Sequence, residues 1–367
     1  MPELHHEGAP THGESVATNC ADHVTDEVTT TLGSPLRLVG FYDVGREKIR
    51  EFARAVQDFN AVHWVESAAK EFGYDELPAS PTFGAILGAI SQRCIFEKFL
   101  PHYDLSQVLH TEQRIVFWRP FVVGDRLVTD VTFEGFRQGH GQDTFVFRTD
   151  ISEIRGEETL LQSSWTTIVA RSGGGTADEN LAVAVDALMM RSMTTASARK
   201  GAAAIGYVDA AIHQREQPMV SAKFVPQPNR SFESVSVGDE LEPHVVELTS
   251  GDLVNYAGVS GDPNPIHWSD LIAKLVGMDT VVAHGMLTMG LGSGLVSSWV
   301  GDPGAIRAYG ARFARPVFVD PQRPAQVHLT GKVKSLDEAA RTAEVTIVAT
   351  SDGKKIFGRA GATVQLG

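Results

Sequence analysis

Hydrophobic and polar positions alternate with a period of two in two separate parts of the chain. In the first part the alternation covers residues 127–133, 144–151 and 163–170, and in the second part it covers residues 343–350 and 360–366. This period is typical of β-strands that bury one face and expose the other. We therefore predict two sets of strands, one in each half of the chain.

Two further stretches predict helices that precede these strands. In residues 44–56, Ile49, Phe52 and Val56 fall on one helical face, and residues 286–300 form an apolar run long enough for a buried helix. No helical pattern separates successive strands within a set, so the strands are expected to be antiparallel. The predicted fold class is α+β, with a long helix and an antiparallel sheet in each half.

A motif recurs at a fixed offset between the two halves. Aligning His63 with His267 gives an offset of 267 minus 63, or 204 residues, and the same offset aligns several other positions. The aligned pairs are Phe52 with Tyr256, Asp58 with Asp262, Asn60 with Asn264, and Gly73 with Gly277. A repeat of this size indicates two similar domains, which also suits a chain of 367 residues.

The pattern divides the chain into four parts. Residues 1–37 are polar without apolar periodicity and are expected to be a disordered tail, followed by a first domain over residues 38–172. Residues 173–228 lack a clean apolar stripe, apart from a short helix suggested by residues 184–193, and are interpreted as a linker with little fixed structure. Residues 229–367 form the second domain. Such a linker would hold the two domains at high effective concentration.

Composition and charge limit the partners and the compartment. The formal net charge of −13 argues against nucleic acid, whose phosphates require an electropositive face. The two cysteines, Cys20 and Cys94, are too few for a disulfide framework and suit a reducing compartment. Neither a signal peptide nor a membrane span is apparent, so a cytoplasmic protein is expected.

The strongest candidate chemistry lies in the second half. Asp262 and His267 are five positions apart in a segment where Pro263 and Pro265 restrict the backbone. A positioned imidazole beside a carboxylate is suited to moving a proton near neutral pH. Gly285 stands at the start of the predicted apolar helix, where free N–H groups could bind a carbonyl oxygen that gains negative charge.

These motifs carry a family resemblance. The order Gly-Asp-Pro-Asn-Pro-Ile-His at residues 261–267, then Ala-His-Gly-Met at 283–286, resembles the signature of the MaoC-like or R-specific hydratase family. Within it, the chain resembles a fused form of the mycobacterial-type (3R)-hydroxyacyl-ACP dehydratase. Residues 41–171 resemble the non-catalytic subunit and residues 230–367 the catalytic one. The resemblance implies a double hot dog, in which each sheet wraps around a long helix.

The resemblance also implies a reaction, the reversible syn elimination of water from a (3R)-3-hydroxyacyl thioester in type II fatty-acid elongation of the mycolic-acid type. Asp262 and His267 would exchange the protons, in roles left open, and the Gly285 N–H would hold the thioester oxygen. Ser293 corresponds to a serine near the site in related hydratases, although a helical serine often bonds to its own helix. Asn264 is expected to hold the turn more than to touch substrate. Neither a cofactor nor a metal is implied.

Several alternatives stay open. The thioester carrier could be acyl carrier protein or CoA, the latter giving an R-specific enoyl-CoA hydratase of fatty-acid breakdown, and a non-enzymatic acyl-binding scaffold is a further alternative. An acidic carrier would need a basic patch. Other type II fatty-acid synthase enzymes are expected partners, and the protein is expected to be a monomer with a pseudo-dimeric core or a homodimer of it. Candidate basic residues are Arg307, Arg312, Arg315, Lys332, Lys334, Lys354 and Lys355.

The first half keeps an acid and an imidazole at the same spacing, as Asp58 and His63. However, Phe59 and Ala61 replace the two prolines, and Ser-Pro-Thr-Phe at residues 80–83 replaces the segment around Gly285. A proline there removes a backbone donor. We therefore interpret this pair as a degenerate second site, in a domain that mainly shapes the acyl channel.

Overall fold

The computed structural model describes residues 32–38, 40–91, 103, 108–139, 141–171, 179–189, 207–209, 219–220 and 224–367. Most of the predicted disordered tail and much of the predicted linker therefore lie outside the described residues.

The described strands form one continuous 14-stranded sheet. Along its main path the order is β7-β1-β4-β5-β6-β3-β10-β14-β12-β11-β9, and every pairing is antiparallel except that of β6 with β8. The strands are β1 (Pro35–Leu38), β2 (Tyr42–Asp43), β3 (Leu109–Phe117), β4 (Arg126–Gly139), β5 (Gln142–Glu153), β6 (Thr159–Arg171), β7 (Tyr207–Asp209), β8 (Met219–Val220), β9 (Glu240–Leu248), β10 (Ile306–Phe313), β11 (Ala325–Asp337), β12 (Thr342–Ser351), β13 (Lys354–Lys355) and β14 (Phe357–Gln365).

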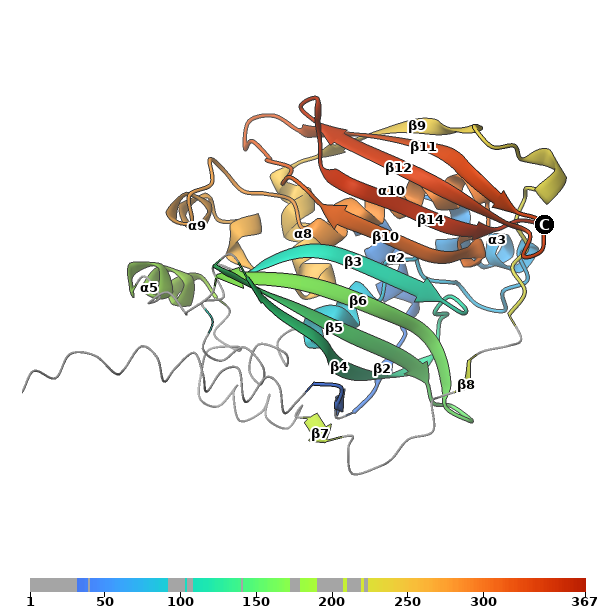
Figure 1. The fold of residues 1–367 in the computed structure, drawn as a ribbon, viewed down its shortest axis with the longest axis horizontal. Coiled ribbons are helices and arrows are strands. Elements are labelled where there is room, and N and C mark those ends of the chain that lie inside the picture. Colours follow the sequence, from blue (N-terminus) through green and yellow to red (C-terminus); the bar gives the residue numbers. More distant parts are fainter. Residues whose placement is uncertain are drawn as a thin grey trace, which may run out of the picture.

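Most helices lie on one face of this sheet, behind the strands in the view of Figure 1, whereas α5 and α9 lie to the left, beyond the ends of the strands. The helices are α2 (Arg46–Ala55), α3 (Glu66–Glu71), α5 (Glu179–Leu188), α8 (Ser250–Ser260), α9 (Asp270–Leu275) and α10 (Gly285–Val300), with the 3-10 turns η1 (Ala61–His63), η4 (Phe232–Ser234), η5 (Pro265–His267) and η6 (Pro303–Ala305). Residues 85–91 are also helical. The two predicted strand sets and both predicted helices are confirmed.

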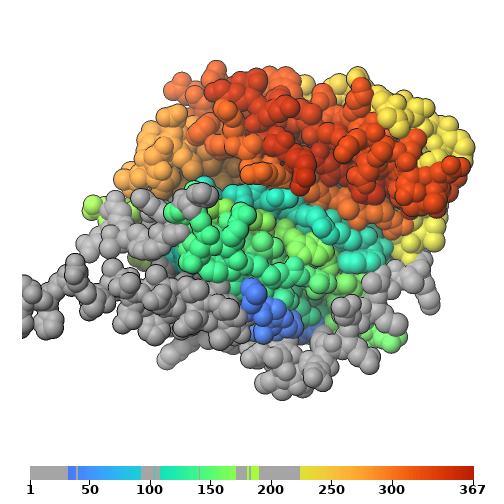
Figure 2. All heavy atoms as spheres, viewed as in Figure 1, coloured from blue at the N-terminus to red at the C-terminus, as the bar shows by residue number. Residues whose placement is uncertain are grey.

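The two halves join through β3 and β10, which pair in antiparallel register with Arg114 opposite Gly310. The halves lie against each other along this seam, as Figure 2 shows. Behind the sheet, the Phe52 ring on α2 meets the Tyr256 ring on α8 at a centroid distance of 6.2 Å. These two aromatic residues occupy the same position of the sequence repeat. The repeat therefore describes two domains related by an approximate two-fold axis.

Helix α10 is buried over most of its length, as its apolar sequence predicts. Gly290 permits close contact with the first domain, because a Cβ there would lie 2.6 Å from Val56 Cγ1. Gly292 faces the sheet, where a Cβ would lie 2.4 Å from the Tyr309 hydroxyl. These glycines bring the helix close to its neighbours on two sides, which fixes the position of its N-terminus.

One part of the predicted linker has a defined structure. Residues 179–188 form helix α5, which lies against α9 of the second domain, and Leu181 on α5 is buried. The expectation of little fixed structure is wrong for this segment, and the short helix expected at residues 184–193 begins five residues earlier. A contact between helices that are far apart in the sequence is tertiary information that the local pattern lacks.

Candidate active site

The loop that carries Asp262 and His267 is shaped by local hydrogen bonds. Helix α8 ends at Gly261, whose φ of 78° turns the chain through the left-handed region that favours glycine. The Asp262 Oδ1 then accepts the Asn264 N–H at 3.2 Å, and the Asn264 side chain accepts the Ile266 N–H at 3.2 Å. The Asn264 side-chain oxygen thus caps turn η5. A contact between Asn264 and substrate remains a prediction.

His267 is buried and held in one orientation. Its Nδ1–H donates to the Val282 carbonyl at 2.7 Å, so in the neutral ring Nε2 carries the free lone pair. Burial lowers the pKa of His267 below its ordinary value of 6.5, although the charge of Asp262 opposes that shift. The imidazole is therefore neutral at neutral pH and can accept a proton at Nε2.

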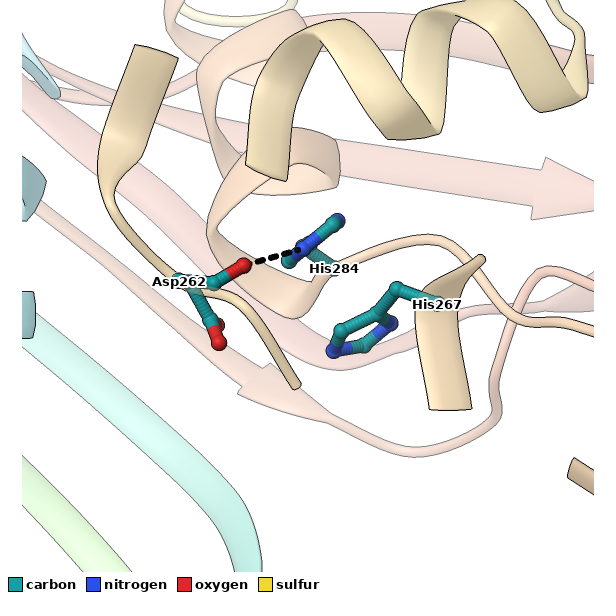
Figure 3. Close-up of side chains that lie close together, drawn as sticks. All are labelled: Asp262, His267 and His284. Atoms are coloured by element: carbon teal, nitrogen blue, oxygen red, sulfur yellow. Dashed lines mark hydrogen bonds between the residues drawn. The ribbon is translucent and has the colours of Figure 1, made fainter. Parts of the chain in front are cut away.

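A third side chain, His284, completes the cluster (Figure 3). Its ring stacks on that of His267 with a centroid distance of 3.7 Å and an interplanar angle of 25°, and its Nε2 lies 3.4 Å from the Asp262 main-chain oxygen. Burial, and next the nearby His267, lower the pKa of His284 well below its usual range. His284 is not among the site residues predicted from the sequence, although its place directly before Gly285 was a usable signal.

The cluster also has donor types that metals use. One ligand atom from each of Asp262, His267 and His284 lies within 4.8 Å of the others. A metal ion binds an imidazole nitrogen along its lone pair, which lies in the plane of the ring. The planes of the two stacked rings are only 25° apart, so they intersect much further from the nitrogens than a metal–nitrogen bond of about 2.1 Å. The two rings therefore cannot bind one ion together in this arrangement. The expectation of a site without a metal or cofactor remains a prediction.

Helix α10 begins beside this cluster, and Gly285 is its first residue. No side chain caps this N-terminus, which leaves N–H groups and the positive end of the helix dipole available to an oxygen ligand. The Phe313 ring lies over Gly285, since a Cβ at that position would be 3.3 Å from it. Phe313 on β10 thus packs directly against the first residue of α10.

Ser293 lies two turns further along α10 and is fully buried. Its Oγ–H donates to the Gly290 carbonyl at 2.8 Å, so the hydroxyl is bonded to its own helix. This is the alternative that the sequence left open for a helical serine. A role for Ser293 in substrate binding remains a prediction.

The corresponding pair in the first half is closed. The Nε2 of His63 lies 3.1 Å from the Asp58 carboxylate, the Nδ1–H donates to Pro78 at 2.7 Å, and both side chains are buried. Burial opposes both charges, yet the Asp58 charge raises the pKa of His63 and the His63 charge lowers the pKa of Asp58. Both shifts favour the charged, ion-paired state of the two side chains. No such hydrogen bond joins the side chains of Asp262 and His267 in the described structure.

Comparison with known proteins follows the same division into halves. Residues 232–351 match the model of the MaoC like domain, and residues 34–159 match the FAS1-like dehydratase domain region. A solved structure described as a MaoC-like dehydratase superposes with a TM-score of 0.82, with 38% identity over 93% of this chain and 100% of its own. The chain belongs to the MaoC-like dehydratase family. This confirms the family predicted from the sequence.

Two further relatives of this MaoC-like chain are informative. A UPF0336 protein of Saccharopolyspora erythraea is 38% identical over 138 residues, which are 38% of this chain and 85% of the relative. A conserved hypothetical protein of Mycobacterium tuberculosis, described as a double hotdog fold, superposes with a TM-score of 0.58 at 12% identity over 91% of this chain and 96% of its own. The second likeness concerns the fold alone, and the predicted α+β double hot dog is confirmed.

The burial of His267 predicts an unusual pH profile for this MaoC-like site. A lowered pKa means that His267 stays neutral as the pH falls through 6.5, the ordinary value for histidine. We therefore expect the acid limb of kcat/KM for hydration to lie below pH 6.5. The measurement is kcat/KM between about pH 5 and pH 8, with circular dichroism at each pH to exclude unfolding. An acid limb above pH 6.5 in folded protein would contradict a neutral His267.

A substitution at the start of α10 tests its N–H group. Gly285→Ala adds a Cβ 3.3 Å from Phe313, which is tight enough to shift either the ring or the backbone that carries the proposed N–H donor. We expect kcat/KM to fall about 10–100-fold, which is less than the loss of about 10²–10³-fold from removing an oxyanion donor, because alanine keeps the N–H. The matched control is Gly294→Ala in the same helix, where no atom lies within 4 Å of the added Cβ. Equal activity in the two variants would exclude this use of Gly285.

Proposed function

We propose that the second half of the chain catalyses the reversible syn elimination of water from a (3R)-3-hydroxyacyl thioester, giving the trans-2-enoyl thioester. The observation that carries this proposal is the contrast between the two acid–imidazole pairs. His63 is bonded to Asp58, whereas His267 is neutral and keeps Nε2 free of the Asp262 carboxylate. An unpaired base beside an uncapped helix N-terminus is suited to removing a proton next to a carbonyl.

The proton transfers follow from the groups present. The thioester acidifies the C2 proton, and His267 Nε2 takes it while the Gly285 N–H binds the oxygen that gains negative charge. The resulting imidazolium gives its proton to the C3 hydroxyl, which Asp262 orients, and water leaves. Each group ends in the protonation state in which it began. Both transfers occur on the face of the substrate that meets the loop of Asp262 and His267, which agrees with syn stereochemistry.

The proposed carrier is acyl carrier protein, with a place in type II fatty-acid elongation. The family resemblance of the two halves to a catalytic and a non-catalytic subunit supports this assignment. Hydration of trans-2-enoyl thioesters on acyl carrier protein and on CoA, at matched chain lengths, tests it. A higher kcat/KM on the protein carrier is expected. Preference for CoA would favour the hydratase of fatty-acid breakdown, and no turnover on either carrier would favour a binding scaffold.

An acidic carrier protein would use exposed cations on the second domain. Arg307 does not belong to the predicted basic patch, because its side chain is partly buried and donates a hydrogen bond to the Trp118 carbonyl at 3.4 Å. The other six candidates are exposed: Arg312, Arg315, Lys332, Lys334, Lys354 and Lys355. They support docking of an acidic partner at the second domain.

The proposed active unit is one chain, because the first domain supplies the pairing partner that β10 needs. No helix in the described part of the chain has the length and apolarity needed to cross a membrane. Cytoplasmic location and the absence of nucleic-acid partners remain predictions from composition.

A further inference from the structure

His110, on strand β3 of the first domain, lies against the proposed active site of the second domain. The edge of its ring contacts Phe313 at a centroid distance of 5.0 Å and an interplanar angle of 71°. Phe313 is the residue that covers Gly285. The Asp262 carboxylate is also near enough for its charge to act on the His110 pKa. An imidazole from the first half therefore contacts Phe313 and lies within reach of the charge of Asp262.

Hydrogen bonds within β3 fix the orientation of this ring. His110 Nε2 lies 3.0 Å from the Gln113 side-chain oxygen and 3.2 Å from the Glu112 carbonyl. Both partners accept, so Nε2 carries the hydrogen and Nδ1 of the neutral ring carries the lone pair. Burial lowers the pKa of His110 despite these bonds and the charge of Asp262, which keeps the ring neutral. The ring thus presents a fixed hydrogen-bond acceptor.

The approximate two-fold symmetry shows what replaces His110 at the closed pair. The bridge of Pro78 with Val122 in the first half recurs as that of Val282 with Phe318 in the second, which gives an offset of 318 minus 122, or 196, residues here. The same offset relates Phe117 to Phe313 and His110 to Ile306. In the first half, a small cavity is lined by residues 79–81 together with Phe117 and Ile306. Residues 79–81 directly follow Pro78, whose carbonyl accepts the hydrogen bond from His63. Ile306 thus borders the first-half site as His110 borders the second-half site.

The presence of Ile306 at the position related to His110 argues that His110 does more than pack against its neighbours. At the closed pair an isoleucine fills the position beside the phenylalanine, so a hydrocarbon side chain suffices for packing there. Gln113 does not require His110 either, since its side-chain oxygen also accepts the Thr166 hydroxyl at 2.8 Å. Of the two related positions, only the one near Asp262 and His267, whose side chains are not hydrogen-bonded to each other, carries an imidazole. Its distinguishing property there is a polar ring nitrogen.

We propose that His110 is a substrate-positioning residue of the second-half site, and that its free ring nitrogen accepts a hydrogen bond from the hydroxyl or water that the reaction removes or adds. This inference rests on the proposed dehydratase function. A hydroxyl that donates to His110 leaves its own lone pair directed at the incoming proton. His110 itself neither gains nor loses a proton. The site is then built from both halves of the chain.

The test compares variants of the full chain that separate ring shape from ring nitrogen. His110→Phe keeps an aromatic edge against Phe313 and removes both nitrogens, whereas His110→Gln keeps polar atoms. We expect His110→Phe to lower kcat for hydration about 10–100-fold with KM within about threefold, and His110→Gln to recover part of that loss. Ile306→Val, at the symmetry-related position, is the matched control and should keep wild-type kinetics. Thermal unfolding of each variant reports on folding.

A double-mutant cycle with Asp262→Asn provides a second criterion. If both side chains hold the same reacting hydroxyl, the loss caused by His110→Phe should shrink at least about threefold in the Asp262→Asn background. Wild-type kcat and KM in His110→Phe would overturn this role for His110, and so would a loss that is fully additive with Asp262→Asn. If Asp262→Asn and His267→Ala were also fully active, the proposed function itself would fail, which is a separate outcome.

Discussion

Asp262→Asn and His267→Ala should each lower kcat by about 10²–10⁴-fold, the range for losing a general acid or base. His267 is the neutral imidazole with a free Nε2, and Asp262 is the carboxylate beside it. Neither substitution breaks a hydrogen bond between the two side chains, because none joins them. The loss should therefore appear in catalysis, with the fold retained.

Steady-state hydration of an enoyl thioester, with circular dichroism and thermal unfolding of each variant, checks this prediction. Gly294→Ala serves as a neutral control from the same domain, since its added Cβ meets no atom within 4 Å. A double variant adds a sharper criterion. If Asp262 and His267 act on one substrate together, the double variant should be about as slow as the slower single variant. Near-wild-type turnover in either folded single variant would exclude this site.

The sequence predicted the fold well because its signals are local. Alternation over residues 343–350 and the apolar run of residues 286–300 each describe one element, and β12 and α10 follow them closely. The 204-residue repeat then related the two halves. Helix α5 was suggested only in part by the sequence, because its contact with α9 of the second domain is not encoded in its own local pattern.

The candidate site could be predicted only in part. Asp262, His267 and Gly285 come from two short motifs that lie close together along the chain. Phe313 and His110 come from strands of different halves, and only the register of β3 with β10 brings them together. Such a register depends on long-range packing, which no local pattern encodes.

Spacing also failed to distinguish the open pair from the closed one. Both pairs place an acid five residues before an imidazole, and both imidazoles donate Nδ1–H to a backbone carbonyl at 2.7 Å. The difference is the bond of 3.1 Å between His63 and Asp58, which has no counterpart at His267. The interpretation of Asp58 and His63 as a degenerate site remains a prediction, which the following experiment tests.

His63→Ala should destabilise the protein by about 3–5 kcal/mol, because it leaves the buried Asp58 carboxylate without its charge partner. Turnover per folded molecule should stay within about threefold of wild type, since the pair has no free atom to offer a substrate. Asp58→Asn combined with His63→Ala should be less destabilising than His63→Ala alone, because it leaves no buried charge. Urea unfolding measures these differences in stability.

The pH dependence of stability provides the decisive comparison between the two pairs. The raised pKa of His63 stabilises the folded state fully below pH 6.5, and this stabilisation is lost as the pH rises through the pKa of His63 in the folded protein. The lowered pKa of Asp58 stabilises the folded state above pH 3.8, and this stabilisation is lost as the pH falls through the pKa of Asp58 in the folded protein. The lowered pKa of His267 has the opposite effect on stability. As the pH falls below 6.5, His267 is protonated first in the unfolded chain, which favours unfolding. Relative to the wild type, His63→Ala should therefore lose most stability between pH 3.8 and 6.5, whereas His267→Ala should gain stability below pH 6.5.

If His63→Ala instead kept its stability across that range and lost about half of the turnover at every chain length, the first half would hold a second working site.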